Sequence, residues 1–415
     1  MASPTPLSKA NTTFSLALLK KFGDDNKTSN IFYSPFSISS ALAMVMLGAR
    51  GNTATQMSEC LKTKDCQDDV HVSFAQLLSE LNKADAPYAL SVANRLYGEQ
   101  SYQFDEDFLG KTKKYYNAEL ETVDFKADSE AARLNINSWV QKKTQDKIKD
   151  LLANGVVDSL SRLVLVNAMY FKSDWNRQFQ QRDTQDAEFR LNKNDTKPVK
   201  MMHQKSWFPF FNKPKANCKN DTKPVKMMYQ KSWFPFFNNP KANCKILEMP
   251  YKGEELSMLI FLPNEMEDST TGLEKLEKQL TYENFMEWTR PDMMNNVEVQ
   301  VGLPRFKMEE TYDMEEVLVS MGMVDAFDGA KSDFSGMSPA NDLELSKVVH
   351  KAFVEVNEEG TEAAAVTAPI VILGCCISPL PHPPVMFIAD HPFIFFIRHN
   401  SSMSILFAGR YCSPE

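Results

Sequence analysis

The sequence predicts an α+β fold, because helical and strand patterns are segregated along the chain instead of alternating. Residues 34–57 and 129–152 carry apolar residues at helical spacing, in the first half of the chain. Residues 256–263 and 296–309 read as strands, and such patterns dominate the second half. Segregation of this kind favours helices packed on large mixed or antiparallel sheets.

The individual elements have recognisable beginnings and ends. Ser34 is a helix cap before the apolar run that Gly48 ends, and a second helix starts shortly after it. Residues 88–98 and 162–175 are further strands. The 415 residues are 43% hydrophobic and contain no Ser- or Gly-rich linker, so we expect one domain spanning residues 1–415.

Charge and cysteine content narrow the possible functions. A net charge of −8 argues against a nucleic-acid surface, and no apolar run is long enough to cross a membrane. The N-terminal stretch reads as an amphipathic helix and not as a signal peptide. Seven cysteines without a CxxC pair predict reduced thiols in a cytoplasmic protein, with no metal and no cofactor.

Catalytic signatures are missing from the chain. There is no GxSxG, HExxH, Walker or GxGxxG motif in a suitable context. His350 lies inside a strand pattern with no perturbing partner nearby, so we interpret it as a hydrogen-bonded core histidine and not as a general base. An enzyme is therefore disfavoured.

One segment differs in composition from the strand patterns on either side of it. Residues 355–369 read EVNEEGTEAAAVTAP, a run of small residues between well-formed strand patterns. A merely flexible loop would favour Gly and Ser, whereas this Ala, Val and Thr mixture tolerates a β conformation.

Five motifs, in order along nearly the whole chain, resemble the serpin family. They are NIFYSPFSISSALAMVMLGARGNTATQM, LVNAMYFKSDW, LPRFKMEETYDMEEVLVSMGM, HKAFVEVNEEGTEAAAVTA and ADHPFIFFIRHNSSMSILFAGRY. The N-terminus and the short tail resemble the intracellular, ovalbumin-like branch. The resemblance implies several helices around three β-sheets, with an exposed reactive-centre loop at residues 358–384.

The resemblance implies that a protease cuts this loop, which then enters the main sheet as a new strand. Small side chains suit this step, because bulky ones would clash in a narrow gap. Gly360 would be the pivot, and Thr361, Ala363 and Ala365 would face the sheet interior by strand alternation. Pro369 lacks an N–H and would strain late insertion. The implied hinge comprises Glu358, Gly360, Thr361, Glu362, Ala363, Ala364 and Ala365.

The family spacing, counted from Glu358, places the reactive bond between Gly374 and Cys375. One residue either way gives Leu373–Gly374 or Cys375–Cys376, and both alternatives stay open. The window holds no basic residue, which favours elastase- or chymotrypsin-like proteases, or cysteine cathepsins, over trypsin-like ones.

The resemblance also implies a polar cluster where the strands of the main sheet part. Its positions match Ser37, Ser39, Asn167 and His350 in this sequence, and Trp175 matches the aromatic residue where insertion begins. Simple core packing would account for the same residues.

A tandem repeat occupies residues 194–245. Two 26-residue copies differ only at His203/Tyr229 and Lys213/Asn239. Two copies are too few for a solenoid, so we expect no added activity. We expect one unit, from about Lys205 to Lys231, to be looped out of the sheets because each copy closes a short loop at its own end. That loop would expose Trp207, Phe208, Phe210 and Phe211.

Three functions remain open at this stage. The first is a monomeric inhibitor of serine proteases, for which leaderless release to the extracellular space stays open as an alternative to cytoplasmic action. The second is a serpin-fold binding or chaperone protein that no longer traps proteases, and the third is an enzyme on an unfamiliar scaffold. The small, uncharged core-facing residues of the hinge, Thr361, Ala363 and Ala365, favour the first over the second.

Overall fold

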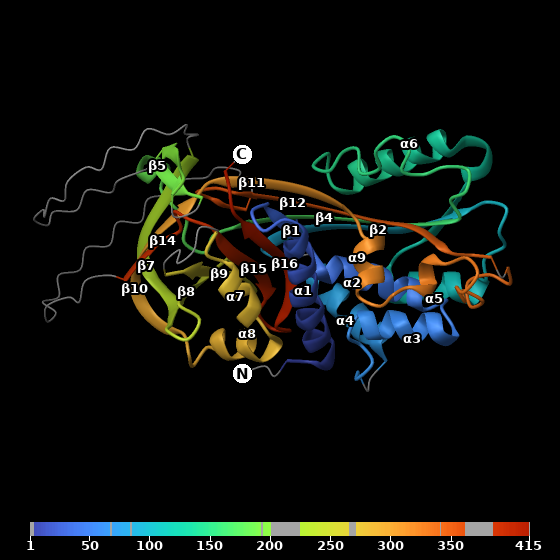
Figure 1. Cartoon of the computed structure of the whole chain (residues 1–415), viewed down its shortest axis with the longest axis horizontal. Coiled ribbons are helices and arrows are strands. Elements are labelled where there is room, and N and C mark those ends of the chain that lie inside the picture. Colours follow the sequence, from blue (N-terminus) through green and yellow to red (C-terminus); the bar gives the residue numbers. More distant parts are fainter. Residues whose placement is uncertain are drawn as a thin grey trace, which may run out of the picture.

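The fold consists of two large sheets with helices packed around them (Figure 1). The computed structural model describes residues 4–66, 69–83, 85–191, 194–200, 225–264, 271–340, 342–361 and 385–414. This arrangement confirms the predicted α+β class.

Six strands form the first sheet, in the order β11-β12-β13-β4-β2-β3. Its central strands β12 and β4 are parallel, and most of the other pairs are antiparallel. The strands are β2 (Tyr88–Glu99), β3 (Leu120–Val123), β4 (Leu163–Asp174), β11 (Phe306–Asp313), β12 (Leu345–Val356) and β13 (Gly360–Thr361).

Ten strands form the second sheet, whose main path is β1-β16-β15-β9-β8-β7-β10-β14. The long strand β7 pairs with both β8 and β10, so the two smaller sheets expected from the resemblance share one continuous ladder. The strands are β1 (Ile31–Tyr33), β5 (Gln185–Arg190), β6 (Thr196–Lys200), β7 (Val225–Asn239), β8 (Cys244–Pro250), β9 (Leu256–Pro263), β10 (Asn295–Pro304), β14 (Val385–Ile388), β15 (Phe393–His399) and β16 (Ser404–Tyr411).

Helices cover both faces of the six-stranded sheet (Figure 1). Helix α6 lies on one face over a core that includes Tyr97 and Phe353, while α2 is buried beneath the other face. The helices are α1 (Pro6–Asp25), α2 (Pro35–Met46), α3 (Gly51–Cys60), α4 (Val70–Leu81), α5 (Glu106–Tyr116), α6 (Phe125–Lys143), α7 (Glu274–Gln279), α8 (Tyr282–Trp288) and α9 (Glu315–Ser320), with 3₁₀ turns η1 (Gln181–Asp183) and η2 (Asp325–Phe327).

Two helix boundaries test the sequence rules. Ser34 caps α2 as predicted, because its hydroxyl accepts a hydrogen bond from the Ser37 N–H. The helix expected over residues 129–152 is wrong beyond Lys143. Gln145 and Asp146 adopt positive φ angles of 54° and 63°, which right-handed helices do not accommodate.

The repeat enters the sheet in a single-copy register. Strand β5 pairs Glu188 with Pro198 of the first copy, and its neighbour Ala187 with Val225 of the second. Pro198 and Val225 thus occupy successive positions opposite β5, although 26 residues, one full unit, lie between them in the chain.

The expected boundary of the omitted unit is therefore wrong. Lys231 pairs with Gln300 inside the sheet, so the second copy is used from Val225 onward. That boundary was predicted from the low entropic cost of closing a short loop at each end of the repeat. The hydrogen bonds that pair β7 with ten positions of β10 outweigh this loop-closure entropy. Trp207, Phe208, Phe210 and Phe211 lie outside the described residues.

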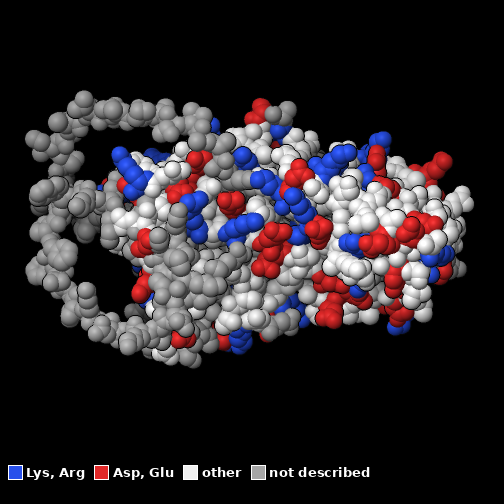
Figure 2. Space-filling model, turned by 90° about the horizontal axis from the view of Figure 1, so that it is seen from above, with Lys and Arg blue, Asp and Glu red and all other residues white. Residues whose placement is uncertain are grey.

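Charged side chains of both signs are scattered among uncharged ones on the face seen in Figure 2. Among its described residues, Lys and Arg lie interspersed with Asp and Glu. In the described part of the chain, no helix is long and apolar enough for a membrane span. The same part holds no group of three or more His, Cys, Asp or Glu side chains placed to bind a metal ion.

Candidate functional site at the head of the six-stranded sheet

The central strands of the six-stranded sheet part at one end. Strands β12 and β4 pair directly from Leu345 and Leu163 as far as Phe353 and Tyr170. Beyond that point β13 lies between them, with Thr361 opposite both Val356 and Ser173. The first two residues after the turn therefore already occupy a strand position in the gap.

Gly360 and Thr361 are suited to this narrow gap. A Cβ atom on Gly360 would lie 2.1 Å from the carbonyl oxygen of Ser173, so only glycine fits. The Thr361 side chain is fully buried, and its hydroxyl lies 3.0 Å from that of Tyr251. Gly360, the residue expected to be the pivot, thus packs directly against the backbone of β4.

A hydrogen-bonded turn precedes β13. The Asn357 side chain accepts from the N–H groups of Glu359 at 3.0 Å and Gly360 at 3.2 Å. The Trp175 indole donates to the Asn357 carbonyl at 3.0 Å, and the Trp175 N–H donates to the Glu359 carbonyl at 2.8 Å. Trp175 also stacks on Tyr251, with ring centroids 4.5 Å apart. The aromatic residue predicted at the head of the sheet therefore holds the loop base.

Glu358 anchors the turn from the other side. Its carboxylate is buried and lies 3.4 Å from the Arg305 guanidinium, and the Thr184 hydroxyl donates to it. Its backbone carbonyl accepts from the Phe179 N–H at 2.8 Å. A buried carboxylate needs such partners, because an isolated charge in the interior is costly.

Further along the seam, a polar row crosses the closed part of the sheet. Asn94 of β2, Asn167 of β4 and His350 of β12 are register partners on adjacent strands. The Asn167 amide donates to Ser37 Oγ at 2.6 Å and to the side-chain oxygen of Asn94. The row joins β2, β4 and β12 to α2 below them.

His350 bridges the seam itself. Its Nε2 accepts from the Ser34 N–H at 3.0 Å, so the ring proton is on Nδ1, which donates to the Asn167 side-chain oxygen. Complete burial lowers the pKa of His350 to about 3, and the ring is therefore neutral at physiological pH. The prediction of a hydrogen-bonded core histidine is confirmed.

The structure brings most, but not all, of the expected cluster together. Ser37 contacts Asn167, whereas the buried Ser39 donates to the Phe36 carbonyl of its own helix at 3.1 Å. Sequence reasoning missed Asn94 and Ser34, which complete the network. Period-two alternation through residues 88–98 would have placed Asn94 on the inner face with Leu96.

The rest of the expected loop lies outside the described residues. The implied hinge and reactive-bond residues beyond Thr361 lie outside the described residues, namely Glu362, Ala363, Ala364, Ala365, Leu373, Gly374, Cys375 and Cys376, as does Pro369. The chain is described again from Val385, where β14 pairs with β10 at the edge of the other sheet.

Comparison with known proteins identifies this architecture. The family model described as serpin (serine protease inhibitor) matches residues 9–220 and 218–414. The chain belongs to the serpin family. The break between the two matches falls at the junction of the repeats, as a family model with one copy of the unit requires.

Individual relatives agree with this assignment. The chain is 50% identical to leukocyte elastase inhibitor from Homo sapiens over 408 residues, which cover 98% of the chain and 99% of the relative. It is 48% identical to the protein of the same name from Xenopus tropicalis over 409 residues, covering the same shares. Among the motifs quoted above, NEEGTEAAA and DHPFIFFIRHNSS carry the resemblance to this inhibitor.

Solved serpin structures share the fold. Uncleaved ovalbumin superposes with a TM-score of 0.83 at 34% identity, covering 98% of this chain and all of the ovalbumin chain. Maspin gives a TM-score of 0.84 at 34% identity, with 98% of each chain covered. The family is described by its inhibitors, and the leukocyte elastase inhibitors are named as inhibitors and not as catalysts, so this serpin is not an enzyme.

Proposed function

We propose that this serpin is a suicide-substrate inhibitor of elastase- or chymotrypsin-like serine endopeptidases. The protease cleaves the loop and forms an acyl-enzyme, and the freed loop enters the seam between β4 and β12 before hydrolysis. Cysteine cathepsins are a second target class, since the loop window accepts medium apolar groups and holds no basic residue.

One observation carries the proposal: Gly360 and Thr361 already pair with β4 at the head of the seam. Insertion of a cleaved loop would extend an existing strand instead of starting a new one. The residues that follow Thr361 are small, and small side chains enter a closely packed sheet at low steric cost.

The energy scale is sufficient for trapping. A dozen new ladder hydrogen bonds at about 1 kcal/mol each, with several hundred Å² of apolar burial at about 25 cal/mol/Å², give on the order of 20 kcal/mol. A free energy of this size can distort the tethered protease so that its oxyanion hole and catalytic triad lose their alignment, which preserves the acyl bond.

Within this mechanism the reactive bond is Gly374–Cys375, with Leu373–Gly374 and Cys375–Cys376 as alternatives. We further propose that the protein works as a monomer in a reducing compartment. Burial raises the pKa of the Cys60, Cys244 and Cys412 thiols to about 12, so all three are inert there.

The decisive experiment is incubation with neutrophil elastase, chymotrypsin and a cathepsin, followed by a denaturing gel and mass spectrometry of the released fragment. We expect a complex that survives denaturation and a fragment that begins at the residue after the reactive bond. A protease whose nucleophile is replaced by alanine is the control and forms no complex. Cleavage of the loop without any stable complex would contradict trapping and favour a non-inhibitory binding role.

A further inference from the structure

The turn between α6 and β4 carries the single Asn-Gly pair of the sequence, at Asn154 and Gly155. These are the two central residues of the turn, which a hydrogen bond from the Val156 N–H to the Ala153 carbonyl closes. Gly155 has a φ angle of 80°, which glycine adopts without strain. Asparagine followed by glycine is the pair whose side-chain amide is chemically least protected, because glycine places no side chain beside it.

Both reacting groups of this pair are accessible. Asn154 and Gly155 are exposed, and neither the Asn154 amide nor the Gly155 N–H has a hydrogen-bond partner among the described residues. A Cβ atom on Gly155 would have no neighbouring atom within 4 Å, so the turn is surrounded by open space. The hydrogen bond that closes the turn is 3.3 Å long, beyond the usual range for N–H···O bonds. Rotation of the Asn154 backbone can therefore bring the Gly155 nitrogen to its side-chain carbonyl carbon.

The chain on either side of the turn is firmly held. The Asn137 side chain accepts from the Leu152 N–H at 2.8 Å and donates to its carbonyl at 2.9 Å, and Arg133 donates to the same carbonyl at 2.8 Å. Beyond the turn, Val157 is buried in the core that α6 covers. A chemical change confined to the turn leaves these contacts in place, so a modified chain stays folded.

We propose that Asn154 is a site of spontaneous modification, at which the folded protein converts its side-chain amide to isoaspartate. The Gly155 nitrogen loses its proton to hydroxide and attacks the side-chain carbonyl carbon of Asn154. A carbon–nitrogen bond forms, ammonia leaves, and a five-membered succinimide results. Water then opens the ring at either carbonyl and yields aspartate or isoaspartate. One water is consumed and one ammonia released, with no oxidation or reduction.

The product defines a partner by its chemistry. Isoaspartate carries a free α-carboxylate beside a backbone that runs through the former side chain. A methyltransferase that recognises this group would move a methyl group from the sulfonium of S-adenosylmethionine to the carboxylate. Loss of methanol from the ester closes the succinimide again, and hydrolysis returns part of the chain to aspartate. The exposure of Asn154 and Gly155 makes the turn accessible to such an enzyme.

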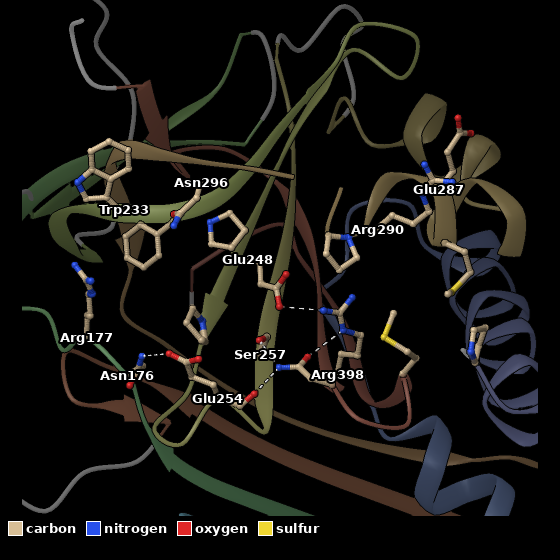
Figure 3. Close-up of a pocket in the computed structure, with 18 of the residues that line it drawn as sticks. Asn176, Arg177, Trp233, Glu248, Glu254, Ser257, Glu287, Arg290, Asn296 and Arg398 are labelled. Atoms are coloured by element: carbon tan, nitrogen blue, oxygen red, sulfur yellow. Dashed lines mark hydrogen bonds and ion pairs between the residues drawn. The ribbon is translucent and has the colours of Figure 1, made fainter. Parts of the chain in front are cut away.

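Asn400 provides a comparison within the same molecule. It is followed by serine, also a small residue, but its side chain is held. The amide donates to the Glu254 carbonyl at 2.8 Å and to Ser257 Oγ at 2.9 Å, and it accepts from Arg398 at 3.1 Å. Ser257 and Arg398 are register partners on β9 and β15 (Figure 3). Cyclisation would break all three bonds, so folding should protect Asn400 and leave Asn154 reactive.

The test compares the folded full-length protein with the same protein in guanidinium, both incubated at mildly alkaline pH. Peptide mapping by mass spectrometry and methylation by an isoaspartyl methyltransferase measure the conversion. We expect Asn154 to convert at comparable rates in the two states, faster at higher pH, whereas Asn400 converts only in the denatured chain. An Asn154 that stays intact in the folded protein but converts in guanidinium would overturn the proposal, as would equal conversion of Asn154 and Asn400 in the folded protein.

Two variants locate the modified residue. Asn154→Gln should abolish the isoaspartate of the folded protein, because glutamine would have to close a six-membered ring, which forms far more slowly. Asn82→Gln, at the exposed end of α4, is the matched control and should leave the isoaspartate yield unchanged. Circular dichroism verifies that both variants fold. A folded Asn154→Gln variant with an unchanged isoaspartate yield would show that the modified residue lies elsewhere and would overturn the assignment.

Discussion

Two places in the sheets lie next to additional chain: the seam between β4 and β12, and the hairpin between β5 and β7. The additional chain pairs with the sheet at the first place and is omitted from the β5 ladder at the second. At the seam, β13 lies between two strands and separates them above Tyr170 and Phe353. At the hairpin, β5 keeps one continuous register and passes over a full repeat between Pro198 and Val225.

The difference lies in what holds each neighbour. The parted end of the seam is stabilised by contacts to the loop base, residues 357–361, which come from Trp175, Tyr251 and Ser173. The hairpin is stabilised by long ladders to β10 and β8 that any extra chain would have to break. The seam thus accommodates β13 between β4 and β12, whereas the hairpin keeps β7 paired with β8 and β10.

The largest expected effect comes from a charge in the incoming strand. Ala365→Arg should abolish the denaturation-resistant protease complex while the loop remains cleavable, because an ionised side chain would enter the sheet interior. Ala364→Arg, on the opposite face by strand alternation, is the matched control and should retain most of the complex. Complex yield by gel densitometry is the measurement, and equal yields from the two variants would show that this face is not buried.

Asn167→Ala tests the polar row of Asn94, Asn167 and His350 in the closed part of the seam. The change leaves the buried Nδ1–H of His350 without its acceptor and removes the hydrogen bonds that the Asn167 amide donates to Ser37 Oγ and Asn94, so we expect a loss of about 3 kcal/mol in the free energy of unfolding. Asn82→Ala, which removes a single surface hydrogen bond to Leu78, is the control and should cost far less. Denaturant titration measures the free energy of unfolding of both variants. Similar losses in the two would show that the polar row does not stabilise the closed seam.

Acid should destabilise the folded protein through His350 of the same polar row. The pKa of His350 is lowered to about 3 by burial, whereas in the unfolded chain it is about 6.5. The unfolded state therefore binds the extra proton between these values, and stability falls as pH drops below about 6.5, by at most about 1.4 kcal/mol per pH unit from this group.

His350→Gln isolates this contribution. Burial also lowers the pKa of His71 and His399, so all three groups act in the same direction. Tyr312 stacks on His350, and burial raises its pKa, so it stays neutral and does not titrate in this window. The variant should show a shallower loss of stability from pH 7 to pH 5, and an unchanged slope would mean that His350 is not the responsible group.

The smallest effect should follow from removing one repeat. Deletion of residues 194–219 and deletion of residues 199–224 give the same sequence, because the copies are identical over the overlap. Since Pro198 and Val225 already occupy successive positions opposite β5, melting temperature and complex yield should stay unchanged. Unfolding of the deletion variant would show that both copies belong to the core.

Residue type and the family resemblance assigned Gly360 and Trp175 to the base of the loop, and both lie there. Their roles in insertion stay predictions. Asn94 and Arg305 escaped prediction because their roles depend on strands that meet only in the folded sheet. The repeat shows the same limit, since local loop lengths favoured a boundary that the long β7–β10 ladder overrode.

The most direct test of loop insertion is the melting temperature of the protein before and after a single cut in the loop by a protease that it does not trap. An inserted loop worth on the order of 20 kcal/mol should raise the melting temperature of a 415-residue chain by about 20 °C. An unchanged or lower melting temperature after the cut would contradict insertion between β4 and β12.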